Sequence, residues 1–108
     1  MYRLTIEARY KRHKLSMETG HYEILFGITI DLAEIDRDEL IDKLGTISKE
    51  LLNKAVELLE EGYKTIRLYI PKEYVLAITR LFNADSEAVI SDNYEYVLVI
   101  EQKNGDRV

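Results

Sequence analysis

The 108-residue chain contains no cysteine, no tryptophan and a single proline. Without cysteine, neither a disulfide framework nor a thiolate metal site can form. No stretch approaches the roughly 18 consecutive apolar residues that a membrane-spanning helix needs, and the first residues lack the uninterrupted apolar core of a signal peptide. We therefore expect an intracellular, cytoplasmic protein without a membrane partner.

The sequence also lacks a glycine-rich phosphate loop, a nucleophile elbow and an HExxH metal motif. His13 and His21 could approach each other across a hairpin and bind a metal together with a nearby glutamate. Their spacing matches no known ligand pattern, however, and a surface histidine pair is the simpler interpretation. We therefore predict no catalytic residue, no cofactor and no metal site.

Length and composition are typical of one folded domain. A chain of 108 residues can bury a core but is too short for two ordinary domains, so we predict a single domain spanning residues 1–108. Its 46% hydrophobic and 32% charged residues are the balance of a globular protein. One glutamine and four asparagines beside many glutamates, lysines and arginines favour a thermophilic source.

Two N-terminal segments alternate apolar and polar residues with the period of a strand that has one buried face. They cover residues 2–10 and 22–32, and we expect them to pair as a hairpin with Thr19 and Gly20 at its tip. In that pairing the inward residues are odd-numbered near the tip but even-numbered near the base. A phase change, either a β-bulge or a long loop, is therefore expected between Tyr10 and Leu15.

A long helical pattern follows between Asp36 and Gly62. Asp36 can cap free backbone N–H groups at the start of a helix, and Gly62 can end it. Gly45 and the Thr46/Ser48 pair could kink or split this helix. The inward stripe is predicted to consist of Leu40, Leu44, Ile47, Leu51, Ala55, Leu58 and Leu59.

The C-terminal half alternates strands and a helix. Residues 64–70 form a strand, and Pro71 begins a second helix at a position where its missing N–H costs little. Two more strands are expected over 87–91 and 94–102, the latter interior to the sheet because residues 97–100 are apolar on both faces. The buried stripe of the second helix is predicted to be Tyr74, Ala77, Ile78 and Leu81.

These elements predict an α+β fold of order β-β-α-β-α-β-β. We expect a single two-layer domain in which a mostly antiparallel or mixed sheet packs against two helices. Residues 102–108 are predicted to be a polar, fraying tail.

A basic run interrupts an otherwise acidic chain. Five basic and two acidic residues give residues 1–20 a net charge of +3, whereas the whole chain carries −5. A segregated basic hairpin can contact phosphates while the acidic remainder limits non-specific adhesion, and an aromatic ring within it can stack on a base. The run, which we take as the candidate nucleic-acid-binding site, consists of Arg9, Tyr10, Lys11, Arg12, His13 and Lys14. The alternatives are a solvated hairpin end and a patch that pairs with the acidic segment of a second subunit.

An acidic segment extends from Asp31 to Asp42. It holds six acidic residues opposed only by Arg37, but it lacks the glycine and fixed alternation of a calcium loop. A helix N-terminus attracts such acids through its dipole. If this surface binds a protein partner, Asp38 and Asp42 are the candidate contacts, and pairing with the basic run of another copy would give a homodimer.

Tyr69 stands apart from the other tyrosines. Ile66, Leu68 and Ile70 share one face of their strand, so Tyr69 lies on the opposite face beside Arg67. A Tyr–Arg pair on an open sheet face could bind a nucleic acid or a protein, although packing against a helix or a second subunit is the commoner use.

The stretch from Glu50 to Val75, with its Leu-rich helix, Gly62 and a strand over residues 65–70, resembles the helix-strand-helix stretch of ribonuclease H-like domains. In that family a glutamate near the start of the helix and an aspartate at the end of the strand help to hold two metal ions for phosphodiester cleavage. Glu50 matches the glutamate, but Pro71 stands about where the aspartate would be. The first strand offers Glu7 in place of the family's aspartate. The resemblance therefore implies the scaffold more than the activity, and leaves a metal-dependent nuclease as a remote alternative.

The leading functional hypothesis is a small non-enzymatic protein that binds DNA or RNA through its basic hairpin. The main alternative is a protein-interaction module, an inhibitor or adaptor, that uses the acidic surface or a sheet edge.

Overall fold

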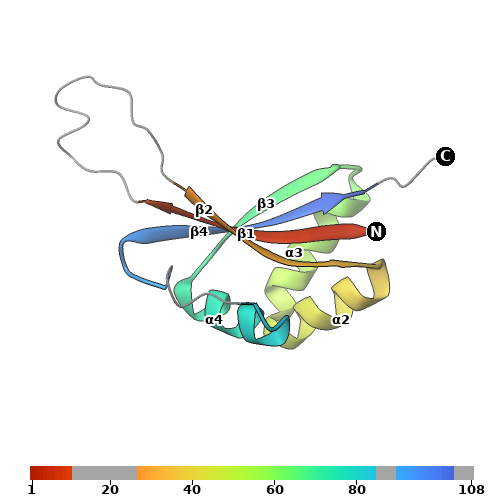
Figure 1. Cartoon of the computed structure of the whole chain (residues 1–108). Coiled ribbons are helices and arrows are strands. Elements are labelled where there is room, and N and C mark those ends of the chain that lie inside the picture. The colour runs from red at the N-terminus through yellow and green to blue at the C-terminus, as the bar shows by residue number, and fades with distance from the viewer. Residues whose placement is uncertain (11–26, 85–89, 104–108) are drawn as a thin grey trace, which may run out of the picture.

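The computed structural model describes residues 1–10, 27–84 and 90–103. Within these residues, four antiparallel strands form one open sheet, and three helices lie against one of its faces (Figure 1). The element order is β-β-α-α-β-α-β. The predicted α+β class is confirmed.

The sheet has the strand order β2-β1-β4-β3. β4 pairs with β1 on one side and with β3 on the other, so the interior position predicted from its apolar run is confirmed. β2 and β3 are the two edges of the described sheet. The strands are β1 (Tyr2–Tyr10), β2 (Gly27–Ile35), β3 (Thr65–Ile70) and β4 (Tyr94–Gln102).

A bulge in β2 reverses the phase of that strand. Leu4 pairs with Ala33 while Thr5 pairs with Asp31, which leaves Leu32 as the extra residue on β2. Ile30 is buried on one side of the bulge and Ile35 on the other, so the inward residues change from even to odd within β2. The phase change predicted between Tyr10 and Leu15, and the Thr19–Gly20 turn, lie outside the described residues.

The first helical pattern is split into two helices by Ser48. The Ser48 N–H donates to the Leu44 carbonyl (2.9 Å) and so ends α2 (Arg37–Ile47), while its hydroxyl accepts from the Leu51 N–H (3.2 Å) and so caps α3 (Lys49–Glu60). At the other end of α2, the Asp36 carboxylate accepts from the Glu39 N–H at 2.8 Å, which confirms the predicted cap.

Two helices end in a Schellman motif. After α3, Gly62 takes a left-handed conformation (φ 95°) and its N–H donates to the Leu59 carbonyl, while Tyr63 donates to Leu58. After α4 (Lys72–Leu81), Asn83 takes the same role with φ 54°. The glycine stop predicted at Gly62 is confirmed.

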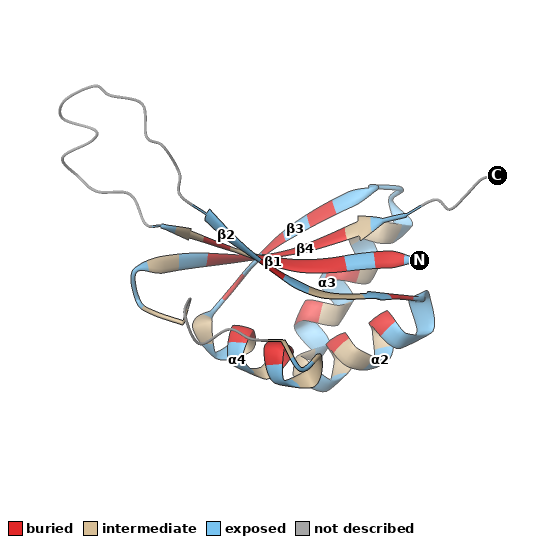
Figure 2. Ribbon diagram, in the orientation of Figure 1, coloured by how far each residue is buried: buried red, intermediate tan, exposed pale blue. Residues whose placement is uncertain are grey.

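The core lies between the sheet and the three helices, and the buried positions of the helices face the sheet (Figure 2). Of the stripe predicted for α2 and α3, four residues are buried and the other three pack against them at the margin. The buried residues of α4 are Val75, Ile78 and Thr79. Of the predicted stripe, Ile78 is confirmed, Tyr74 packs against the core at its margin, and Ala77 and Leu81 are only half-buried. Thr79 can be buried because its hydroxyl donates to the Val75 carbonyl at 2.8 Å.

The last predicted elements are only partly described. Of the strand expected over 87–91, Ile90 and Ser91 are described and lie in no strand, and residues 85–89 lie outside the described part. Gln102 belongs to β4 rather than to a tail, whereas residues 104–108 are not described. Among the described residues, no helix is long and apolar enough to cross a membrane.

Candidate functional site

β1 ends at Tyr10, the second residue of the basic run. Tyr10 is 50% exposed and pairs across the sheet with Tyr94 on β4. Their rings meet edge to face with centroids 5.7 Å apart, and Tyr94 in turn lies 6.4 Å from Tyr96. The three rings form a row from exposed Tyr10 to buried Tyr96, so Tyr10 has a fixed position and still faces solvent.

Arg9, the first residue of the basic run, is already paired. Its Nη2 donates to Glu7 Oε1 at 2.7 Å, and this hydrogen bond raises the pKa of Arg9. Glu7 is shared with Arg67 on β3, so one carboxylate faces two guanidinium groups, and the phosphate contact predicted for Arg9 stays a prediction. The remaining residues of the run lie outside the described part of the chain: Lys11, Arg12, His13 and Lys14.

Glu7 links two strands on the sheet face that carries no described helix, which we call the open face. Its Oε2 accepts from Arg67 Nη1 on β3 at 2.9 Å, while its Oε1 accepts from Arg9. Burial alone would raise the pKa of Glu7, but the hydrogen bonds and charges of the two arginines outweigh it and hold the pKa below its ordinary range. Arg3 and Asp31 form a second pair on this face at 3.3 Å.

The middle of the open face is dry even though no described helix covers it. Val97 is only 1% exposed, and in register it lies between Glu7 on β1 and Tyr69 on β3. Val99 is also buried, between Thr5 and Arg67. Long polar side chains can shield apolar neighbours with their stems.

Tyr69 itself is 71% exposed, so its predicted place on the face opposite Leu68 is confirmed.

A pocket of about 280 Å³ lies where β3 ends and β4 continues. β3 and β4 pair as far as Ile70 and Tyr96. Pro71 then ends β3, because a proline has no N–H to donate to a ladder. We call this site the tyrosine pocket; it is lined by Tyr69, Ile70, Pro71, Lys72, Ser91, Asp92, Tyr94, Glu95 and Tyr96.

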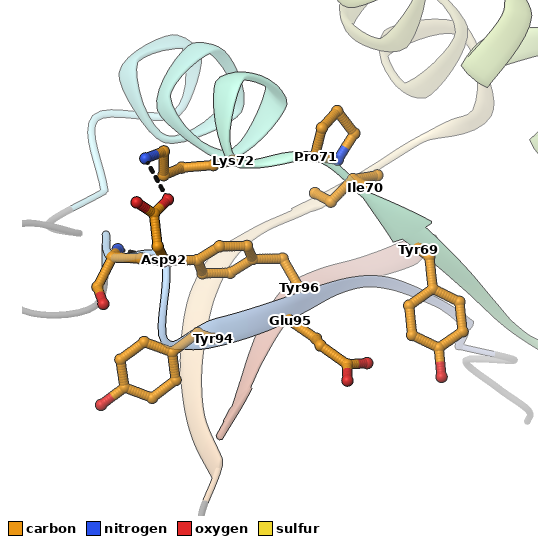
Figure 3. Close-up of a pocket in the computed structure, with 9 residues that line it drawn as sticks. Tyr69, Ile70, Pro71, Lys72, Asp92, Tyr94, Glu95 and Tyr96 are labelled. Atoms are coloured by element: carbon orange, nitrogen blue, oxygen red, sulfur yellow. Dashed lines mark hydrogen bonds and ion pairs between the residues drawn. The ribbon is translucent and has the colours of Figure 1, made fainter. Parts of the chain in front are cut away.

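Hydrogen bonds hold the wall of the tyrosine pocket in place. The Tyr96 hydroxyl accepts from the Ser91 N–H at 2.9 Å and donates to the Ser91 carbonyl at 3.0 Å. Lys72 Nζ donates to Asp92 Oδ1 at 2.7 Å, which raises the pKa of Lys72. Figure 3 shows Tyr69 and Tyr94 at opposite ends of the pocket, with the Glu95 carboxylate between them.

Sequence reasoning missed the tyrosine pocket. Its lining comes from β3, the start of α4, the residues before β4 and the first residues of β4, so no single stretch of sequence contains it. Pro71 was the available signal, because it predicts that β3 ends while β4 continues.

The acidic segment is distributed over several structural roles. Asp36 caps α2, Asp31 pairs with Arg3, and Arg37 lies 3.7 Å from Glu60. Asp38 and Asp42 are exposed on α2, where the role predicted for them as partner contacts stays a prediction. Among the described residues, no three histidine or acidic side chains gather closely enough to hold a metal ion.

The two glutamates of the ribonuclease H-like resemblance lie in different layers. Glu50 is exposed in the first turn of α3, in the helical layer, whereas Glu7 lies on the open face. No protein-family model, curated protein or solved structure matches the chain. The resemblance therefore stays a prediction.

Proposed function

We propose that this protein binds single-stranded DNA or RNA through the basic run. The observation that carries the proposal is the placement of Tyr10. It is the last residue of β1, it is half exposed, and it directly precedes three permanent positive charges in the sequence. An exposed aromatic ring beside cations is the combination that binds a strand without sequence readout, by stacking on a base and neutralising phosphates.

The packing of Tyr10 suits a stacking role. The edge-to-face contact with Tyr94 fixes the ring before any ligand arrives, which reduces the entropy lost on binding. Stacking of a base on an aromatic side chain contributes about 1–3 kcal/mol. In Figure 1, the end of β1, where Tyr10 lies, extends past the described helices.

The phosphate contacts rest on Lys11, Arg12 and Lys14, because Arg9 is bound to Glu7. Three contacts to a single strand predict that log K falls with log salt concentration with a slope of about −2. The acidic remainder of the chain, which gives a net charge of −5, keeps non-specific adhesion low.

Fluorescence anisotropy of labelled single- and double-stranded oligonucleotides over a range of salt concentrations tests the proposal. We expect the triple variant K11Q/R12Q/K14Q to bind weakly and with a slope near zero, since the phosphate contacts are gone. A matched control, K43Q/K49Q/K54Q, removes three lysines from the helical layer and should bind like the wild type. Absence of binding at low salt would overturn the proposal.

A protein-interaction module is the second candidate. It is favoured by the open face, which exposes Tyr69 beside Arg67 with no described helix above them. If the chain fails to bind oligonucleotides but sediments as a homodimer, and Tyr69→Ala dissociates that dimer, this candidate replaces the first.

A further inference from the structure

The tyrosine pocket lies next to the proposed strand-binding site. Tyr94 is shared between them, because its ring contacts Tyr10 on one side and lines the pocket on the other. Tyr69 bounds the far end of the pocket (Figure 3). Tyr10 and Tyr94 lie on the helical face and Tyr69 on the open face, so a nucleic-acid strand that stacks on Tyr10 reaches the pocket by passing around the edge of β4 that β3 leaves unpaired.

The size of the pocket fits one base. Its volume of about 280 Å³ falls just below the roughly 300–1,000 Å³ of sites that enclose drug-sized ligands. A flat heterocycle in contact with a tyrosine ring is a ligand of the right size and shape. Pro71 and Ile70 add an apolar wall.

The charges of the pocket favour a base over a phosphate. Its lining holds two carboxylates, Asp92 and Glu95, and one ammonium, Lys72, that is already bonded to Asp92 at 2.7 Å. Arg9 stands opposite Glu95 in register and adds a positive charge beside it, so the site as a whole is close to neutral and offers a phosphate no excess of positive charge. Carboxylates only accept hydrogen bonds, so they select ligands whose edges carry N–H donors.

We propose that the tyrosine pocket binds one unpaired nucleobase of the bound strand and prefers guanine to uracil or thymine. The proposal rests on the nucleic-acid-binding function proposed above. Guanine presents two adjacent donor groups and one acceptor on its Watson–Crick edge, which matches carboxylate acceptors beside the Lys72 ammonium. Uracil and thymine present one donor between two carbonyl acceptors, and those acceptors would face the carboxylates.

The test compares three labelled oligonucleotides of equal length. One is all thymidine, one has a single central deoxyguanosine, and one is an abasic phosphodiester chain. We expect the guanosine-containing strand to bind about tenfold more tightly than the all-thymidine strand, the size of one good base contact. Tyr69→Ala and Glu95→Gln should each remove that preference. They should leave the salt slope and the binding of the abasic chain unchanged.

Tyr63→Ala is the matched control, because Tyr63 is 55% exposed and does not line the pocket. Tyr94→Leu tests the shared ring, with thermal melting to confirm that the variant is folded. An amide-resolved NMR titration with guanosine, which carries no phosphate, gives an independent readout, since Glu95 and Ser91 should shift.

The outcomes separate the two proposals. If the pocket variants bind all three strands like the wild type while K11Q/R12Q/K14Q loses binding, the proposed function stands and the pocket inference is overturned. Equal affinity of the wild type for the thymidine and guanosine strands also overturns it. If no strand binds at low salt, both proposals fail.

Discussion

One face of the sheet is covered by the three described helices, whereas no described helix lies over the open face (Figures 1 and 2). Both faces keep β4 away from water. On the helical face Leu98 and Ile100 are fully buried among other apolar side chains, and on the open face Val97 and Val99 are buried in register with Glu7, Arg67 and their neighbours. The comparison shows that burial of a strand does not by itself reveal a second layer of structure.

The two faces should differ most in how much stability their apolar residues contribute. We expect Leu98→Ala to lower the free energy of unfolding by about 2–5 kcal/mol, because it leaves a cavity that the helices cannot fill. Val99→Ala, one residue along the same strand, should cost about 1–2 kcal/mol, since fewer methyl groups are removed and the side chains above can relax. Urea denaturation measures both.

Equal losses for the two variants would contradict this difference. They would indicate that the open face is packed as tightly as the helical face, as expected if a second subunit covers it in solution. Repeating the Val99→Ala measurement over a hundredfold range of protein concentration separates these cases, because the stability of a dimer depends on concentration.

Which residues lie on which face of the sheet could be predicted from the sequence, because side chains alternate between the two faces along a strand. Tyr69 and Leu68 were assigned to opposite faces correctly, and the apolar run over residues 97–100 correctly placed β4 inside the sheet. The Asp36 cap and the split near Ser48 were also predictable, since capping depends on residues a few positions apart.

Features that depend on tertiary contacts could not be predicted in this way. The bulge at Leu32 appears only when β2 is aligned with β1. Burial of Thr79 in α4 was missed because a threonine reads as polar, and its hydroxyl bonds to the backbone of its own helix. The pairing of Glu7 with Arg67 joins residues 60 positions apart, so charge counts along the sequence could not show that one carboxylate is shared by two arginines.

The next largest effect is expected for the ion pairs of the open face, which should make the stability of the protein depend on pH. Burial opposes ionisation of Glu7, but its arginine partners outweigh burial and lower the folded pKa. The ion pairs therefore stabilise the protein above about pH 4.3, the unfolded value of a glutamate, and this contribution is lost as the pH falls through the lower folded value. We expect Glu7→Gln to cost about 1 kcal/mol at pH 7, as is usual for ion pairs near the surface, and progressively less as the pH falls below about 4.3.

Urea denaturation of both proteins between pH 7 and pH 2.5 measures this effect. Glu101→Gln is the matched control. Glu101 lies on the neighbouring strand β4, and its described ion pair, with Lys103, is long at 3.9 Å. A difference between wild type and Glu7→Gln that persists unchanged at pH 2.5 would show that packing, rather than charge, is what Glu7 contributes to the open face.

The smallest effect on stability is expected from a substitution in the tyrosine pocket, beyond the end of β3. The pKa of Lys72 is raised by its hydrogen bond to Asp92 and by the charge of that carboxylate, so any stabilisation is present at neutral pH and is lost only as the pH rises through the raised value. Both partners are exposed to solvent, and such pairs contribute little. We therefore expect Lys72→Gln to melt at the wild-type temperature at pH 7 in physiological salt. A clear drop in melting temperature would mean that the Lys72–Asp92 pair stabilises the fold. An unchanged melting temperature would mean that the pair can act on ligand binding but not on stability.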